Sequence, residues 1–282
     1  MSDLTQLAKE HGLFPIGTRP AVGQYIRDAW RRRGFAATLA RYRLIASTAR
    51  SRLGAAWIVI VPSLQILTYG LIFGLVLGSS RPDNFLPYLV VGVVIFQMLA
   101  GAFSDGARSI TSNVSLARTL NFPRVLLPLA ALIAQFLKSA GLILLMLLVL
   151  PLLGEMPNWN WFLLIPTLLL ALLFGFGVAL IAARLTVQLE DLSQLIPFVT
   201  RVAFYASGVF FSFDKLADAV PWIGALEWAN PVALFLALGR SGLVAGYEVP
   251  GWYWPLALAW GVLTVIVGFV FFYLAEERYG RG

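Results

Sequence analysis

The chain has 282 residues, of which 59% are hydrophobic and only 12% are charged, and its mean hydropathy is +0.81. Soluble domains carry about 25% charged residues, so a water-soluble fold of this size has no means of burying so many apolar side chains. The absence of cysteine excludes disulfides and thiolate metal sites, and a single histidine, His11, argues against zinc sites and Ser-His-Asp triads. The composition therefore predicts an integral membrane protein.

Six apolar runs are long enough to cross a bilayer, which takes about 20 residues of helix. Each run is expected to be helical, because an unpaired backbone group in lipid costs several kcal/mol. We therefore predict an all-α membrane protein, with residues 1–55 as an N-terminal cytoplasmic segment and residues 56–282 as a six-span membrane domain. The predicted spans are residues 56–78, 86–103, 129–150, 162–183, 195–213 and 255–274.

The distribution of Lys and Arg predicts the orientation of these spans. Sixteen of the 21 basic residues lie in residues 1–55, in the second-to-third and fourth-to-fifth connections and in the C-terminal tail, whereas three lie on the opposite side. We expect both termini to be cytoplasmic. The net charge of +7 then reflects topology, and no nucleic-acid partner is needed to explain it.

Residues 25–52 interleave arginines with Trp30, Phe35 and Tyr42. This spacing is typical of an amphipathic helix that lies at the membrane interface with its arginines against anionic headgroups. The alternative is that the arginines only set the topology, which leaves the aromatic residues unexplained.

The external segment between the fifth and sixth predicted spans, residues 214–254, contains an apolar run at residues 231–245 that is too short to span. We expect a pair of re-entrant half-helices, with residues 216–226 as the partner, that narrows or gates a pathway. The alternative is a loop on the headgroups, anchored by its tryptophans. The candidate gate residues are Pro221, Trp222, Asn230, Pro231 and Arg240.

The predicted spans contain no Asp, Glu or His, which argues against ion-driven transport because coupling ions usually bind such groups. The sequence also has no GxxxxGK[ST] motif for binding ATP. If this chain performs active transport, its energy must therefore come from another polypeptide.

Two predicted spans carry a basic residue. Arg201 shares a helix face with Phe198 and Tyr205, an arrangement that suits a phosphate and stacked sugars. The alternative for Arg201 is snorkelling to the cytoplasmic interface. Lys138 has no acid in the predicted spans to pair with and is expected to face protein or a wet cavity.

Small and aromatic residues recur along the first span. Gly70, Gly74 and Gly78 form two overlapping GxxxG units that either form a helix-packing seam or occur by chance. Tyr69 and Phe73 lie beside this stripe, and Phe204 and Phe210 of the fifth span add further aromatic side chains. Tyr69, Phe73, Phe198, Arg201, Phe204 and Tyr205 are the predicted substrate-path residues.

The cytoplasmic connection at residues 104–124 is short and amphipathic, with an apolar stripe that includes Leu116. Such a segment is able to dock in the groove of a partner. The other cytoplasmic connection offers Glu190 and Asp191 as a smaller counterpart.

Taken in order, several motifs resemble the permeases of polysaccharide-export ABC transporters. The run at residues 51–57, Ser-Arg-Leu-Gly-Ala-Ala-Trp, is followed by Pro62, Tyr69 and Phe73-Gly74. The loop after the second span carries Asn113, Leu116, Phe122-Pro123-Arg124 and Pro128, and the external segment carries Asn230-Pro231 and Arg240. The resemblance covers roughly residues 25–275, and the Phe-Pro-Arg block is its most specific part.

The resemblance implies a bacterial inner-membrane permease that is not itself an enzyme, forms a homodimer and binds two copies of a separate ABC ATPase, which holds ATP and Mg²⁺. This chain would bind no cofactor of its own. The loop after the second span would be the coupling helix, which points to Asn113, Leu116, Phe122, Pro123 and Arg124, with Glu190 and Asp191 as secondary contacts. The substrates of the family are lipid-linked glycans or polyol phosphates, such as O-antigen, capsule, teichoic acid or cell-wall galactan.

We therefore expect the membrane subunit of an exporter for a lipid-linked polysaccharide, O-antigen or galactan, that passes through a channel at the dimer interface. Arg50, Arg52 and Arg201 are the candidate contacts for its pyrophosphate. The alternatives are an ATP-independent flippase, a permease that exports drugs or small glycolipids, and a membrane scaffold.

Overall fold

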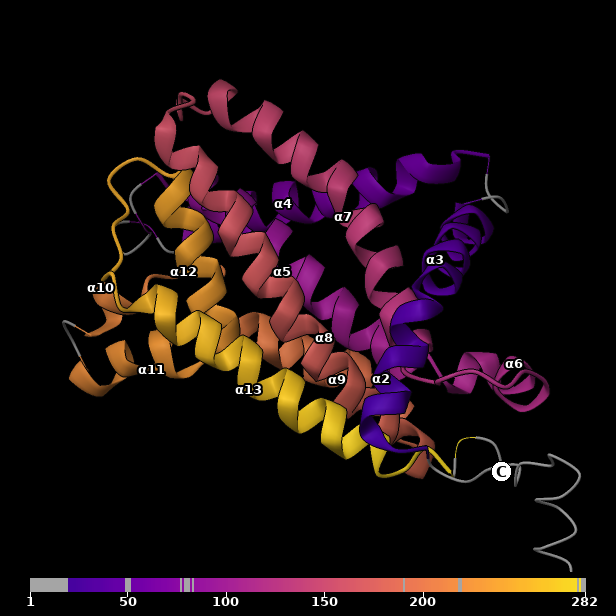
Figure 1. Cartoon of the computed structure of the whole chain (residues 1–282). Helices are drawn as coiled ribbons and strands as arrows, with labels where there is room; N and C mark the ends of the chain where they lie inside the picture. Colours follow the sequence, from indigo (N-terminus) through magenta and orange to yellow (C-terminus); the bar gives the residue numbers. More distant parts are fainter. Residues whose placement is uncertain are drawn as a thin grey trace, which may run out of the picture.

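The computed structural model describes residues 20–48, 52–76, 78, 82, 84–189, 191–217, 220–277 and 279, and every regular element among them is a helix (Figure 1). Five of these helices are long and apolar enough to cross a membrane. The all-α prediction is thus confirmed for this part of the chain, and the protein is an integral membrane protein.

The five long helices correspond to the predicted first, second, third, fourth and sixth spans. They are α4 (Trp57–Val76), α5 (Phe85–Ala107), α7 (Leu126–Leu152), α8 (Leu164–Gln188) with the 3-10 helix η4 (Trp159–Leu163) before it, and α13 (Tyr253–Tyr273). The second, third and fourth extend beyond their predicted bounds by several residues, because helices continue past the apolar core into the interface. This extension brings Asp105 into α5.

The predicted fifth span is shorter than expected. Its helix, α9 (Leu192–Ala206), has 15 residues, which corresponds to about 22 Å, less than the roughly 30 Å of the hydrocarbon core. The helix ends where Gly208 adopts a left-handed conformation with φ of 67°. The prediction that the span continues to residue 213 is therefore wrong.

The helix α5 forms the centre of the bundle and α4 its periphery. Of the residues in the apolar stretch of each helix, 78% are buried in α5 and 6% in α4. The longest packing contact joins α8 and α13, and α5 packs against both α7 and α8. The core of the described protein therefore lies among α5, α7, α8 and α12, and one whole side of α4 is left open.

The described part of the helix predicted at residues 25–52 is two helices instead of one, α2 (Val22–Arg31) and α3 (Arg33–Thr48), and the break lies at Arg32. A short 3-10 helix, η1 (Gly54–Ala56), leads into α4. The loop after α5 contains η3 (Thr111–Asn113) and α6 (Val114–Thr119), which projects from the bundle on the same side as α2 (Figure 1). The location of α2 and α3 at a membrane interface stays a prediction.

The external segment folds into four short elements: α10 (Phe213–Ala217), η5 (Pro221–Gly224), α11 (Ala225–Ala229) and α12 (Pro231–Leu243). Residues 222–229 and 231–243 form a helix pair bent by 85°. A bent pair of short helices is therefore present in this segment, but the partner of α12 is residues 222–229 and not the predicted residues 216–226. Their re-entry into a membrane stays a prediction.

Candidate functional site

A pocket of about 430 Å³ opens between α4, α5, α7 and α9. Its volume is in the range of about 300–1,000 Å³ that small-molecule sites occupy. Its lining includes the rings of Tyr69, Phe96 and Phe204, named here the aromatic wall, together with three side-chain amides and the guanidinium of Arg201. The lining residues are Gln65, Tyr69, Phe96, Gln97, Ala100, Gly101, Ser104, Gln135, Pro197, Thr200, Arg201 and Phe204.

The aromatic wall continues outward as a cluster of rings from three helices and the loop after α9. Phe204 contacts Phe96 at 4.8 Å and Phe210 at 5.0 Å between ring centroids. Phe210 in turn stacks on Phe73 at 4.2 Å and lies edge-on to Tyr69 at 5.2 Å. Such a surface binds the C–H face of a sugar ring without buried charge.

The structure brings together only some of the predicted path residues. Tyr69, Arg201 and Phe204 line the pocket, and Phe73 belongs to the ring cluster beside it. Tyr205 belongs to the same cluster, because its ring centroid lies 5.8 Å from those of Phe204 and Phe210, and half of its surface is exposed. Phe198 lies outside the pocket, with 64% of its surface exposed. The shared face of Phe198, Arg201 and Tyr205 is thus the open side of α9.

Most of the lining residues were not predicted from the sequence, among them three glutamines: Gln65 of α4, Gln97 of α5 and Gln135 of α7. Each is a polar side chain within an apolar span, and such residues are expensive in a membrane and commonly functional. That signal was available in the sequence, whereas the convergence of the three amides is visible only in the fold.

Lys138 does have an acidic partner, contrary to the prediction. Its Nζ lies 2.9 Å from Asp105 Oδ2, because α5 continues one turn beyond the predicted span. The pair lies near the pocket, since Ser104 is one of the lining residues. Burial lowers the pKa of the nearby Arg43 guanidinium, and the charge of Asp105 opposes this shift.

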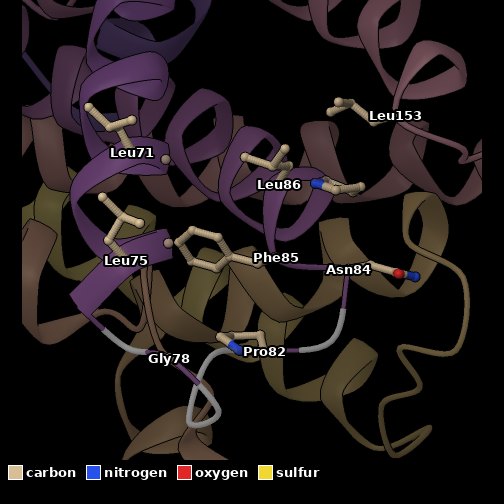
Figure 2. A pocket seen from close by; sticks show the side chains of 11 residues that line it. Leu71, Leu75, Gly78, Pro82, Asn84, Phe85, Leu86 and Leu153 are labelled. Carbon is tan, nitrogen blue, oxygen red and sulfur yellow. The ribbon is translucent and has the colours of Figure 1, made fainter.

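A second, larger groove of about 1,040 Å³ lies between the end of α4 and the start of α5 (Figure 2). Gly70 and Gly74 face α5 here, because a Cβ atom on them would lie 3.2 Å from Leu86 and 3.8 Å from Phe85. Gly78 follows the helix with a φ of 50° and has open space around it. Two of the three predicted packing glycines thus contact the neighbouring helix.

Arg240, which the sequence assigned to the candidate external gate, is buried inside the protein. Its Nη2 donates to the Gly208 carbonyl at 3.0 Å, and its guanidinium carbon lies 3.4 Å from the centroid of the Tyr88 ring. The Tyr88 hydroxyl donates to the same Gly208 carbonyl. Arg240 therefore joins α12 to α5 and to the break that ends α9.

Asn230 occupies the bend of the helix pair. Its Oδ1 accepts from the Val232 backbone N–H at 3.0 Å and caps α12, and its Nδ2 donates to the Ala206 carbonyl at 3.2 Å. Pro231 follows at the first turn, where its missing N–H is harmless. The Trp222 side chain is exposed, and that of Pro221 lies outside the described residues. The bend is thus fixed to the end of α9.

The Phe-Pro-Arg block packs against other segments of the same chain. Phe122 and Pro123 are buried, and the Phe122 ring lies 4.9 Å from that of Phe35 in α3. Asn113 is half-buried and donates to the Ser109 carbonyl at 2.8 Å, and Leu116 is half-buried as well. The exposed side chains of this loop are those of Ser115, Arg118, Thr119 and Leu120, together with those of Arg108, Thr111, Ser112 and Asn121.

Tyr25, Glu276 and Arg124 form a buried junction, named here the Glu276 junction. The Tyr25 hydroxyl donates to Glu276 Oε2 at 2.8 Å and accepts from the Val125 N–H at 3.1 Å. Glu276 Oε1 accepts the Arg124 N–H at 3.0 Å and lies 3.5 Å from the Arg124 guanidinium. The junction joins α2, the loop after α5 and the end of α13.

We expect Glu276→Ala to lower the free energy of unfolding by about 3 kcal/mol, because it strands a buried hydroxyl and a guanidinium. Tyr25→Phe should lower the free energy of unfolding by about 1 kcal/mol, because it removes one buried hydroxyl. The matched control is Glu277→Ala, since that neighbouring side chain is exposed. Thermal unfolding midpoints of the detergent-solubilised protein measure these effects, and equal midpoints for both Glu variants would contradict the junction.

Burial raises the pKa of the Glu276 carboxyl above its usual range, and the hydrogen bonds from Arg124 and Tyr25 oppose the shift. A raised folded-state pKa means that the folded protein binds the proton more tightly than the unfolded chain. Stability should therefore fall as the pH rises from the unfolded pKa through the folded one. Glu276→Gln should remove this dependence in unfolding midpoints measured across pH.

The remaining predicted residues do not join the pocket. Arg52 is exposed before α4, and Asp191 is exposed before α9. Arg50 and Glu190 lie outside the described residues. Among the described residues, no three His, Asp or Glu side chains gather closely enough to hold a metal ion.

Comparison with known proteins identifies relatives over most of the chain. It is 25% identical over 235 residues to the O-antigen export system permease protein RfbA of Klebsiella pneumoniae, which covers 82% of this chain and 88% of the relative. It is 23% identical over 232 residues to the polysialic acid transport protein KpsM of Escherichia coli, and this match covers 80% of this chain and 87% of the relative. The ABC-2 type transporter model matches residues 36–244, well over half of the sequence, and the chain therefore belongs to the ABC-2 type transporter family.

Proposed function

We propose that this chain is the membrane subunit of an ATP-driven exporter that moves a lipid-linked polysaccharide, O-antigen or cell-wall galactan, from the cytoplasm across the bacterial inner membrane. The observation that carries this proposal is the pocket between α4, α5, α7 and α9, whose aromatic and amide walls suit sugar rings and hydroxyls. The related proteins named for O-antigen and polysialic acid export agree with it.

In our proposal two copies of the chain form the export channel. The pocket opens toward α4 and α9, whose outer faces carry exposed apolar side chains such as Leu67, Leu71 and Val202. A second copy that presents the same two helices would cover these faces and convert an open pocket into a closed path. The exposed rings of Phe198 and Tyr205 would then face that path or the dimer seam.

Energy would come from two copies of an ABC ATPase that hold ATP and Mg²⁺, and this chain would need no cofactor. The exposed part of the loop after α5, including Arg118 and Leu120, is the surface available to this partner. The excess of Lys and Arg in the N-terminal segment, this loop and the tail supports a cytoplasmic location for all three.

Deletion of the gene in its own host, followed by measurement of polysaccharide at the cell surface, tests the proposal. We expect the surface polymer to disappear and its lipid-linked precursor to accumulate inside. An affinity-tagged chain should co-purify with an ATPase subunit in equal amounts. Unchanged surface polymer would contradict the exporter, and a permease that purifies without any ATPase would contradict the energy source.

Arg201→Ala should reduce export roughly tenfold or more, because a charge-assisted hydrogen bond to a phosphate contributes about 1.5–3 kcal/mol. Arg201→Lys should retain part of the activity, since it keeps the charge and loses the bidentate geometry. The matched control is Arg41→Ala, at an exposed position of α3. Export by Arg201→Ala at the rate of the control, with equal protein in the membrane, would exclude a pyrophosphate role for Arg201.

A further inference from the structure

Three carboxamides from three different helices meet on one side of the pocket, and they are named here the glutamine strip: Gln65, Gln97 and Gln135. Gln97 Nε2 donates to Gln65 Oε1, and Gln135 Nε2 donates to the Gln97 backbone carbonyl at 3.3 Å and to Ser139 Oγ at 3.3 Å. The strip thus runs from α4 across α5 to α7.

These bonds leave part of the strip unsatisfied. A carboxamide offers two N–H donors and an oxygen with two lone pairs. No hydrogen bond from the described protein reaches Gln65 Nε2, Gln97 Oε1 or Gln135 Oε1, and all three side chains are half-buried at the pocket. Whichever way each amide is turned, the strip presents both donors and acceptors.

The α5 backbone leaves room for the Gln135 side chain of the glutamine strip. A Cβ atom at Gly101 would overlap the Gln135 carboxamide, so the absence of a side chain at Gly101 allows that amide to lie against α5. Unsatisfied polar groups at membrane depth cost about 1–3 kcal/mol each by protein measurements. Three of them on one wall are expected where a ligand or water supplies the missing partners.

We propose that the glutamine strip is a hydroxyl-binding subsite for the sugar units of the exported glycan. A sugar hydroxyl both donates and accepts hydrogen bonds, which matches the free donors and acceptors of the strip. A phosphate, by contrast, needs donors only. Tyr69 and Phe204 on the aromatic wall would contact the C–H face of the same ring. No acidic side chain lines the pocket, which suits a neutral glycan segment.

This inference rests on the proposed function and deepens it. It separates two parts of one substrate path: Arg201 for an anionic group, and the glutamine strip for hydroxyls. A lipid chain would gain nothing from the strip, because alkyl groups leave the amides unpaired. The subsite therefore predicts discrimination in favour of polyhydroxylated segments.

The cysteine-free sequence allows a direct test with single-cysteine variants. Gln135→Cys and Gln65→Cys are expressed with the ATPase partner, and their reaction with a water-soluble cationic methanethiosulfonate reagent is timed in membranes. Membranes from hosts that make the polymer are compared with membranes from hosts in which its synthesis is blocked. We expect both thiols to react, and to react at least about fivefold more slowly when polymer fills about four sites in five, because bound polymer shields the thiol and the rate follows the unoccupied fraction.

The matched control is Met156→Cys, in the loop that follows the same helix as Gln135, where the side chain is exposed. Its reaction rate should be independent of the polymer. Rates at Gln135→Cys and Gln65→Cys that are also independent of the polymer would overturn the subsite.

Export by Gln135→Leu and Gln97→Leu supplies a second readout. Each should fall about fivefold per lost hydrogen bond at equal protein abundance. If gene deletion abolishes surface polymer while both Leu variants export at the parental rate, the subsite is wrong and the exporter stands. If deletion leaves the surface polymer unchanged, the proposed function itself fails, and the sugar assignment of the strip fails with it.

Discussion

Arg240→Ala should destabilise the folded protein by about 4 kcal/mol. The guanidinium is 1% exposed and donates to the carbonyls of Tyr88, Gly208 and Val209. Its removal leaves these buried acceptors with fewer partners, at about 1–3 kcal/mol for each unsatisfied group, and opens a cavity beneath α12. Thermal unfolding midpoints of the purified protein in detergent measure the loss.

Two further variants separate the charge from the volume. Arg240→Lys should recover only part of the stability, because an ammonium group cannot reach all three carbonyls in a fixed plane. Gly92→Ala should disturb the same guanidinium from the opposite side, since its Cβ would lie 2.5 Å from Arg240 Nη2. The control is Arg31→Ala at an exposed position of α2, and an Arg240→Ala midpoint equal to that of this control would contradict the argument.

The effect of Arg240 bears on function because the same residue links α12, α5 and the turn that ends α9. It fixes α12 against α5 and against the turn at Gly208, where α9 ends. Phe210, two residues later, supports the ring cluster beside the pocket. Loss of Arg240 should therefore loosen the aromatic wall as well as the bent helix pair.

The apolar runs predicted five of the spans well, because membrane burial requires a continuous stretch of apolar helix whatever the neighbouring helices are. The fifth was mispredicted at Gly208, since a left-handed glycine and the hydrogen bonds that hold it do not alter the mean hydropathy of the run. Window hydropathy likewise ended the second span at Phe103, so the Asp105–Lys138 pair was missed.

Side-chain convergence was predicted less well than helix position. Tyr69, Arg201 and Phe204 line the pocket as expected, because aromatic and basic residues stand out in an apolar span. The glutamine strip depends on the relative rotation of α4, α5 and α7, which no local pattern encodes. The burial of Arg240 and Phe122 is likewise a tertiary effect. Arg240 donates to a backbone carbonyl far away in the sequence, and the Phe122 ring packs on a ring of another helix.

Gly177→Ala should destabilise the protein by about 2–3 kcal/mol through overpacking, because α8 and α13 touch backbone to backbone at this position. A Cβ atom at Gly177 would lie 2.5 Å from the Val265 amide nitrogen and would also overlap the Thr264 carbonyl group. Backbone cannot rotate away as a side chain does, so the two helices would have to separate. The unfolding midpoint in detergent is the measurement.

Gly268→Ala tests the same contact from α13, since its Cβ would lie 2.5 Å from the Gly177 carbonyl oxygen. The two substitutions should be less than additive, because either one alone already separates the helices. The matched control is Gly261→Ala, where the Cβ would meet only the flexible Leu173 side chain at 3.0 Å and the cost should stay below about 1 kcal/mol. Equal losses for Gly177→Ala and Gly261→Ala would show that the spacing of α8 and α13 is not set by backbone contact. If the losses differ as expected, this spacing also fixes Glu276 at the end of α13 against Arg124, so Gly177→Ala should weaken the Glu276 junction without altering any residue of it.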